Sequence, residues 1–194
     1  MRTWWFVIPL ILTLVCVLPD EAQSLRAQSV LQTDPAVYLL PLEDLPGGFE
    51  HQPQRDRTIV EPGVVRALRF YTRGAPEVPT EEHASILLAV SISDSADLAA
   101  MDFQQTVLTW THLGYDLSPL ENGVGEEAVA GWDLLYAGTD HPKQAALLFF
   151  RTGMVNATVQ WTDDPDRVTL DHAIAIARLM ELRIDAQIVS SKRQ

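Results

Sequence analysis

"LLFFRTGMVNATVQW", residues 147–161, contains two apolar stretches that meet at Gly153. Glycine tolerates the positive φ that a tight hairpin turn requires. In the first stretch, large apolar residues occupy consecutive positions, so a strand there is apolar on both faces and must be covered on both. In the second stretch, apolar residues alternate with polar ones such as Asn156 and Thr158. The stretch predicts a β-hairpin that is scaffold: its first strand lies mid-sheet, and its second is nearer an edge or half exposed.

Further strands and helices are predicted on the N-terminal and C-terminal sides of this hairpin. The clearest strand covers residues 84–93, where every second residue is apolar along one face. The period then changes from two to that of a helix, with Asp94 and Ser95 as capping residues and Ala99 and Phe103 on the apolar face. We expect strands near residues 48–53, 64–72, 84–93, 128–137, 143–151 and 154–162, and helices at 94–113 and 165–188.

The predicted order of elements is β-β-β-α-β-β-β-α. Sequential strands joined by short turns pair mostly antiparallel, and helices cover the faces of such a sheet. We therefore expect an α+β fold with a mainly antiparallel six-stranded sheet and two packed helices. The chain divides into a signal peptide or N-terminal anchor (1–27), an extended lead-in (28–43), a single α+β domain (44–188) and a tail (189–194).

The N-terminus has the pattern of an export signal. Residues 4–18 are apolar apart from a threonine and a proline, and they follow Arg2. This run is shorter than the ~20 residues of a typical membrane-spanning helix and matches the apolar core of a signal peptide. Cleavage after Ser24 or Ala27 would leave a secreted or cell-envelope protein. The alternative is an uncleaved anchor, which would then be the chain's link to a membrane.

Cys16 is the single cysteine of the chain and lies inside this apolar run. A lipoprotein signal would place a small residue before it and a leucine three before it, whereas Val15 and Thr13 stand there. Lipidation is therefore disfavoured. Once the signal is removed, the exported chain has neither a disulfide nor a thiol nucleophile.

The charge balance limits the possible partners. The 14 basic and 26 acidic residues give a formal net charge of −12. Nucleic-acid binding requires a basic face that replaces counterions, and docking on an anionic membrane has the same requirement. We therefore expect an acidic, soluble surface that binds no nucleic acid. The prevalence of arginine among the basic residues favours a bacterial source.

Four segments resemble, in order, exported bacterial proteins of the Mog1/PsbP-like α/β fold, including cell-envelope lipoproteins: "DLPGGFE" (44–50), "GVGEEAVAG" (123–131), "LLFFRTGMVNATV" (147–159) and "DHAIAIARLMELRI" (171–184). The resemblance covers most of residues 44–188, and its motifs are structural. Glu126 stands where the family usually has aspartate. The resemblance implies an accessory or binding domain without a transferable catalytic motif.

Common catalytic and metal-binding motifs are not found. The five histidines contain no i,i+4 pair and no H-E-x-x-H motif, and "GVGEE" precedes a strand and so is not a phosphate loop that opens a helix. Asp163, Asp164 and Asp166 crowd a helix start, where the helix dipole favours carboxylates; calcium binding there is the alternative. Asn156 begins an N-glycosylation pattern, but it lies in a predicted strand. We expect no metal, no cofactor and no catalytic residue.

Four aromatic residues are the candidate ligand-binding positions, because aromatic side chains form the walls of apolar pockets. They are Trp110, Trp132, Tyr136 and Trp161. The alternative is that these residues belong to the core and that their polar edges find hydrogen-bond partners there.

These observations predict a non-enzymatic exported accessory or binding domain at the cell envelope, which binds an unknown envelope protein or a small apolar ligand. The alternative is an exported hydrolase whose active-site residues are far apart in the sequence, since a Ser/His/Asp triad needs no local motif. A hydrolase requires a cleft with converging ionisable groups. A binding domain requires an apolar cavity or an exposed apolar patch.

Overall fold

The computed structural model describes residues 34–74, 83–121, 123–135 and 142–191. The expected signal segment, Cys16 and Tyr136 lie outside these residues. Within them, no helix combines the length and the apolar character that crossing a membrane requires.

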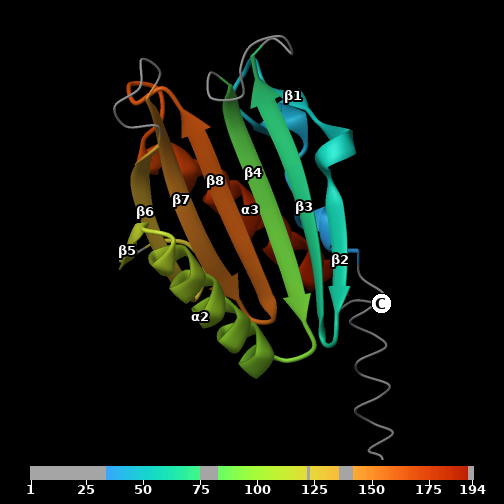
Figure 1. The fold of residues 1–194 in the computed structure, drawn as a ribbon. Coiled ribbons are helices and arrows are strands. Elements are labelled where there is room, and N and C mark those ends of the chain that lie inside the picture. The colour runs from blue at the N-terminus through green and yellow to red at the C-terminus, as the bar shows by residue number, and fades with distance from the viewer. Residues whose placement is uncertain (1–33, 75–82, 122, 136–141, 192–194) are drawn as a thin grey trace, which may run out of the picture.

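In the described part of the chain, eight strands form one antiparallel sheet (Figure 1). Its main path runs β1-β3-β4-β8-β7-β6-β5, and β2 pairs with β3 beside β1. Every neighbouring pair is antiparallel. The strands are β1 (Glu50–His51), β2 (Arg57–Glu61), β3 (Val64–Arg73), β4 (Ala84–Ser93), β5 (Asp116–Pro119), β6 (Glu127–Leu135), β7 (Lys143–Thr152) and β8 (Val155–Asp163).

The expected six-stranded sheet is wrong, and so is the expected order of elements. The described residues contain two strands that were not expected, β2 before β3 and β5 before β6. All five residues of β2 are exposed, so β2 has no apolar face that would reveal it in the sequence. β5 has only four residues and ends at a proline, in a stretch where no strand was expected.

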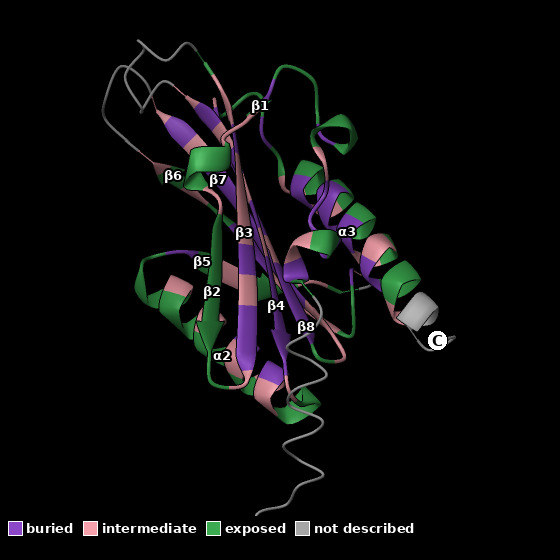
Figure 2. Ribbon diagram, turned by 90° about the vertical axis from the view of Figure 1, so that its right-hand side faces the viewer, coloured by how far each residue is buried: buried purple, intermediate pink, exposed green. Residues whose placement is uncertain are grey.

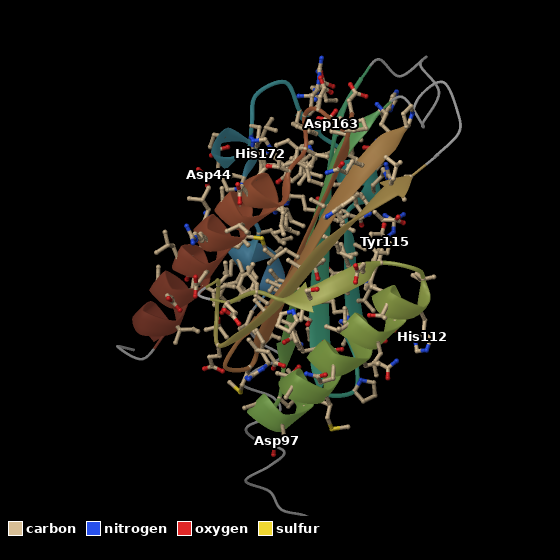
Figure 3. The ribbon with its side chains drawn as sticks, turned by 90° about the vertical axis from the view of Figure 1, so that its left-hand side faces the viewer. Asp44, Asp97, His112, Tyr115, Asp163 and His172 are labelled. Atoms are coloured by element: carbon tan, nitrogen blue, oxygen red, sulfur yellow. The ribbon has the colours of Figure 1, made fainter. Side chains whose placement is uncertain are left out.

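Two long helices among the described residues cover opposite faces of the sheet (Figure 3). The helix α2 (Ala96–His112) begins at Ser95, whose side chain accepts a hydrogen bond from the amide of Leu98, as an N-cap does. The helix α3 (Leu170–Ser191) packs on β6, β7 and β8. The face under α3 carries the larger core cluster, and the face under α2 carries a smaller one around Phe103, Leu147 and Phe149.

The hairpin of β7 and β8 lies in the middle of the sheet. Leu147, Leu148, Phe149 and Phe150 are all buried, which confirms that the first strand is covered on both faces. Gly153 takes a φ of +59° at the turn. The second strand, β8, does not lie near an edge, because it is hydrogen-bonded between β4 and β7.

The described part of the expected lead-in, residues 34–43, packs against the sheet. It forms the 3-10 helices η1 (Pro35–Tyr38) and η2 (Leu42–Asp44), and a third 3-10 helix, η3 (Pro53–Arg55), precedes β2. The side chains of Tyr38, Leu39 and Leu40 are buried in the larger core cluster. The domain therefore extends N-terminally beyond residue 44.

Candidate functional site

A row of polar side chains crosses the sheet on the face under α2. Arg66 on β3 pairs in register with Ser91 on β4, and Ser91 pairs with Asn156 on β8. Residues that are directly opposite on neighbouring strands project from the same face. Three strands that are distant in sequence therefore place an arginine, a hydroxyl and an amide side by side.

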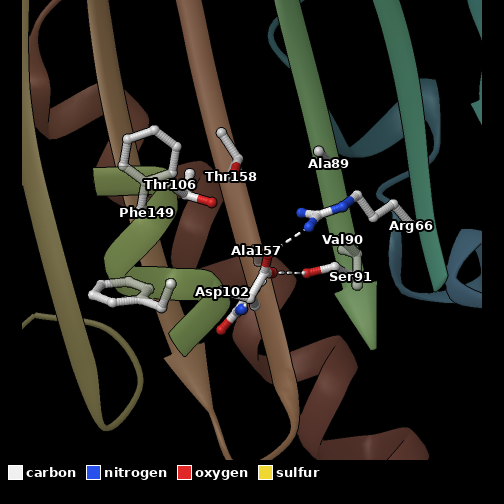
Figure 4. Close-up of a pocket in the computed structure, with 11 residues that line it drawn as sticks. Arg66, Ala89, Val90, Ser91, Asp102, Thr106, Phe149, Ala157 and Thr158 are labelled. Atoms are coloured by element: carbon white, nitrogen blue, oxygen red, sulfur yellow. Dashed lines mark hydrogen bonds and ion pairs between the residues drawn. The ribbon is translucent and has the colours of Figure 1, made fainter. Parts of the chain in front are cut away.

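Asp102 on α2 completes this row. One of its carboxylate oxygens accepts a hydrogen bond from Arg66 Nη2, and the other accepts from Ser91 Oγ at 3.1 Å and from Asn156 Nδ2 at 2.9 Å (Figure 4). The Asp102 side chain is only 11% exposed. Burying a carboxylate costs free energy of folding unless the group is paired and hydrogen-bonded. Here both carboxylate oxygens of Asp102 have hydrogen-bond partners.

Asn156 has a single amide orientation that suits its neighbours. Its Nδ2 also donates to the carbonyl of Ala99 at 2.9 Å, so the nitrogen faces α2. Its Oδ1 is buried and has no hydrogen-bond partner among the described residues. A buried acceptor without a donor is uncommon, and it can accept a hydrogen bond from a bound molecule or an ordered water.

A groove runs along α2 above this row. A cavity of about 50 Å³ lies between the helix and the sheet, and a hollow of about 380 Å³ lies on its outer side. The two share Arg66, Asp102 and Thr106. The inner cavity is lined mostly by apolar atoms from Ala89, Phe103 and Phe149, and the outer hollow by Glu61, Gln105, Thr106, Thr109 and Trp110.

The local sequence of α2 explains why one helix contributes both core and groove residues. Phe103, Val107 and Trp110 form its apolar stripe against the sheet. Asp102 and Thr106 are spaced four apart beside that stripe, so they stand on one side of the helix. A helix that packs over β7 therefore directs its polar flank toward β3 and β4.

Arg66 interacts with both carboxylates of the groove, Asp102 and Glu61. Burial alone would lower the pKa of Arg66, but hydrogen bonds and charge interactions with Asp102 and Glu61 outweigh this effect and raise the pKa above its ordinary value. Glu61 lies 3.3 Å from Arg66 Nε and is half exposed. One cation against two carboxylates leaves a formal charge of −1 among the ionisable groups that line the groove.

Of the four aromatic candidates, Trp110 lines the groove. It is half-buried, and its ring lies edge-on to Tyr115, with centroids 5.0 Å apart, and 6.0 Å from the ring of Phe149. It is therefore a wall of the outer hollow and also part of the smaller core cluster.

The other aromatic candidates do not join Trp110. Trp132 on β6 and Trp161 on β8 flank Ala146 of β7 in the register, on the face under α3. Trp132 is 57% exposed, whereas Trp161 is 4% exposed. Tyr136 lies outside the described residues. The sheet thus separates Trp110 from Trp132 and Trp161, and the three do not line one pocket.

Two of the three aspartates near the start of α3 form ion pairs with cations of the chain. Asp163 forms an ion pair with Arg73, and Asp164 accepts a hydrogen bond from Lys143 Nζ at 2.5 Å. This hydrogen bond lowers the pKa of Asp164 below its ordinary value. In the part of the chain that the structure describes, no three His, Cys, Asp or Glu side chains are placed to hold one metal ion.

Sequence reasoning missed Asp102, Arg66 and Ser91 as a set. The signal was present in part: Ser91 lies on the weaker face of the strand at residues 84–93, and Asn156 lies on the polar face of the hairpin. What joins them is the pairing of β4 with β8 across a long stretch of sequence, which no local pattern reveals.

Comparisons with known proteins found no matching family model, no similar curated protein and no similar solved structure. The resemblance to Mog1/PsbP-like proteins therefore stays a prediction.

Proposed function

We propose that this protein is a non-enzymatic, exported binding domain of the cell envelope, and that it holds a small amphipathic molecule in the groove beside α2. The observation that carries the proposal is the groove itself. Its outer hollow of about 380 Å³ falls within the range of ~300–1,000 Å³ typical of small-molecule sites. Such sites combine apolar walls with a few polar groups that orient the ligand.

The groove has both kinds of wall. Trp110 offers an aromatic surface at the outer hollow, and Ala89 and Phe149 line the inner cavity. Asn156 Oδ1 offers an unused acceptor near the inner end. We infer that the ligand has an apolar or aromatic body and a hydrogen-bond donor. The formal charge of −1 disfavours an anionic ligand.

The alternative of a hydrolase has less support. Ionisable groups do converge in the groove, but Asp102 and Arg66 form an ion pair with each other. Ser91 donates its hydroxyl hydrogen to Asp102, whereas the nucleophilic serine of a Ser/His/Asp triad donates to a histidine. The histidine side chains that the structure describes, at 51, 83, 112 and 172, do not line the groove.

Binding can be tested with N-phenyl-1-naphthylamine, an uncharged amphipathic dye whose fluorescence rises in apolar sites. We expect the full chain to bind it. Thr106→Phe should weaken binding by about tenfold or more, equivalent to about 1.4 kcal/mol, because Thr106 lines both the inner cavity and the outer hollow. The anionic dye 1-anilinonaphthalene-8-sulfonate should bind more weakly than the uncharged one.

Thr111→Phe is the matched control. It places the same side chain on an exposed position of the same helix, away from the groove. Equal dye binding by Thr106→Phe, Thr111→Phe and the unmodified chain would show that the groove is not the site.

Export has a separate test. Mass spectrometry of the protein purified from its native envelope should find an N-terminus near Leu25 or Gln28, because the apolar run at residues 4–18 is short for a stable span. The same measurement would detect a retained small molecule. Recovery of an intact Met1 on membrane-bound material would contradict cleavage.

A further inference from the structure

The outer edge of β2 is an unpaired strand edge. β2 pairs only with β3, and its other side carries no strand among the described residues (Figure 1). All five of its residues are exposed along its length (Figure 2). Ile59 is 41% exposed and Val60 is 69% exposed. Such an edge presents free backbone donors and acceptors to another strand.

The sequence of β2, Arg-Thr-Ile-Val-Glu, is complementary to itself in the antiparallel direction. If a second copy of β2 lies alongside with a two-fold axis at Ile59, then Arg57 stands opposite Glu61 of the second copy, and Glu61 opposite its Arg57. Ile59 meets Ile59, and Thr58 meets Val60. Opposite charges and apolar residues that face each other across strands stabilise their pairing.

The charged side chains of this strand share one of its faces, and each has a partner in its own chain: Glu61 forms an ion pair with Arg66 at 3.3 Å and is 53% exposed. Arg57, Ile59 and Glu61 alternate with Thr58 and Val60, so both charged residues and the central isoleucine share one face. Arg57 Nη1 donates to the backbone carbonyls of Gln54 and Asp56, which holds its side chain beside the strand. Pairing would also remove the exposed apolar surface of Ile59 and Val60 from water.

We propose that the protein forms a two-fold symmetric dimer through antiparallel pairing of β2 with β2 of a second copy, so that the two sheets become continuous. An interface of this kind uses the same patch on both subunits, and it gains main-chain hydrogen bonds as strand addition does. The Arg57–Glu61 pairs fix the register. The dimer shares one residue with the proposed ligand groove, Glu61, but its test reads association and not ligand binding.

Charge-reversed variants test the dimer in a way that separates loss of pairing from loss of folding. We expect the full chain to be a dimer in sedimentation equilibrium at micromolar concentrations. Arg57→Glu places two glutamates opposite each other at both ends of the interface, and Glu61→Arg places two arginines there. Each single variant should weaken dimerisation by about tenfold or more, because two attractive pairs become repulsive.

The decisive measurement is an equal mixture of the two single variants. In that mixture every glutamate at position 57 or 61 of one chain faces an arginine of the other, so a heterodimer should form at concentrations where each variant alone is mainly monomeric. The double variant Arg57→Glu/Glu61→Arg should dimerise with itself and not with the unmodified chain. Arg178→Glu and Asp185→Arg, on exposed positions of α3, make the same charge changes away from β2 and should leave the dimer intact.

Three results would overturn the proposal. One is a monomer at all concentrations, including a monomer that instead binds a strand of another protein. The second is a dimer that survives both single reversals, because its interface would lie elsewhere. The third is the absence of a heterodimer in the mixture of two folded single variants, with folding verified by circular dichroism.

Discussion

Phe149 shows how one residue serves both the core and the groove. Its side chain is 2% exposed, it packs with Phe103 and Trp110, and it lines the inner cavity. Truncating a core aromatic side chain costs about 3–5 kcal/mol, a large share of the ~5–15 kcal/mol that stabilises a typical domain. Phe149→Ala should therefore lower the free energy of unfolding by this amount, measured by urea denaturation.

Thr158→Ala is the control on the partner strand. Phe149 and Thr158 are directly opposite each other in the register, but Thr158 is half exposed. Its truncation should change stability by about 1 kcal/mol or less. If Phe149→Ala is as stable as the unmodified chain while Thr158→Ala abolishes dye binding, the hairpin is a binding element rather than scaffold.

The sequence predicts the burial of side chains such as Phe149 better than the burial of side chains such as Asp102. A run of large apolar residues in a strand has one stable environment, a position covered on both faces. A single aspartate in an amphipathic helix is ordinarily solvated. Whether it is buried depends on which donors the sheet places beneath it, and Arg66, Ser91 and Asn156 come from three different strands.

At the scale of elements, the accuracy of prediction followed the strength of the apolar pattern. The strand expected at residues 84–93 is confirmed as β4, because one of its faces is apolar throughout. The second helix begins at Leu170 and not at Pro165, since the intervening residues form a turn in which the amide of Arg167 donates to the carbonyl of Asp164. β2 and β5 are hydrogen-bonded to the longer strands β3 and β6, and neither has an apolar alternation that would predict a strand.

The attachment of β5 depends on Gly131 of β6. A Cβ atom at Gly131 would lie 2.1 Å from the carbonyl oxygen of Asp116, far inside van der Waals contact. β5 is short and lies at the sheet edge, so it can shift more readily than the central strands. We expect Gly131→Ala to separate β5 from β6 and to cost about 1–3 kcal/mol, as overpacking does.

Hydrogen exchange followed by mass spectrometry would locate this effect. The amides of β5 should exchange faster in Gly131→Ala, whereas those of β7 and β8 should keep their protection. Gly47→Ala is the control, because a Cβ atom there meets no atom within 4 Å and its backbone conformation is open to other residues. Unchanged exchange in β5 would mean that the close approach at Gly131 does not hold the edge strand.

At the scale of the whole molecule, the N-terminal boundary of the domain determines whether the sheet is covered. The larger core lies between the sheet and two layers of chain, α3 and the segment around η1. Tyr71 donates its hydroxyl hydrogen to the carbonyl of Leu40 at 2.5 Å, and Arg183 Nε donates to the carbonyl of Val37 at 2.7 Å. The segment thus links the sheet to α3.

A chain that begins at Gln28, within the expected cleavage region, keeps this segment, and a chain that begins at Pro46 lacks it. The shorter chain loses the buried side chains of Tyr38, Leu39 and Leu40, and a fully buried side chain of this size contributes about 1.5–3 kcal/mol. The combined loss approaches the total stability of a typical domain. We expect the chain from Gln28 to unfold cooperatively on heating, followed by circular dichroism, and the chain from Pro46 to show no cooperative transition. Equal melting temperatures would mean that residues 34–45 do not stabilise the sheet, and that the domain begins where the sequence alone placed it, at residue 44.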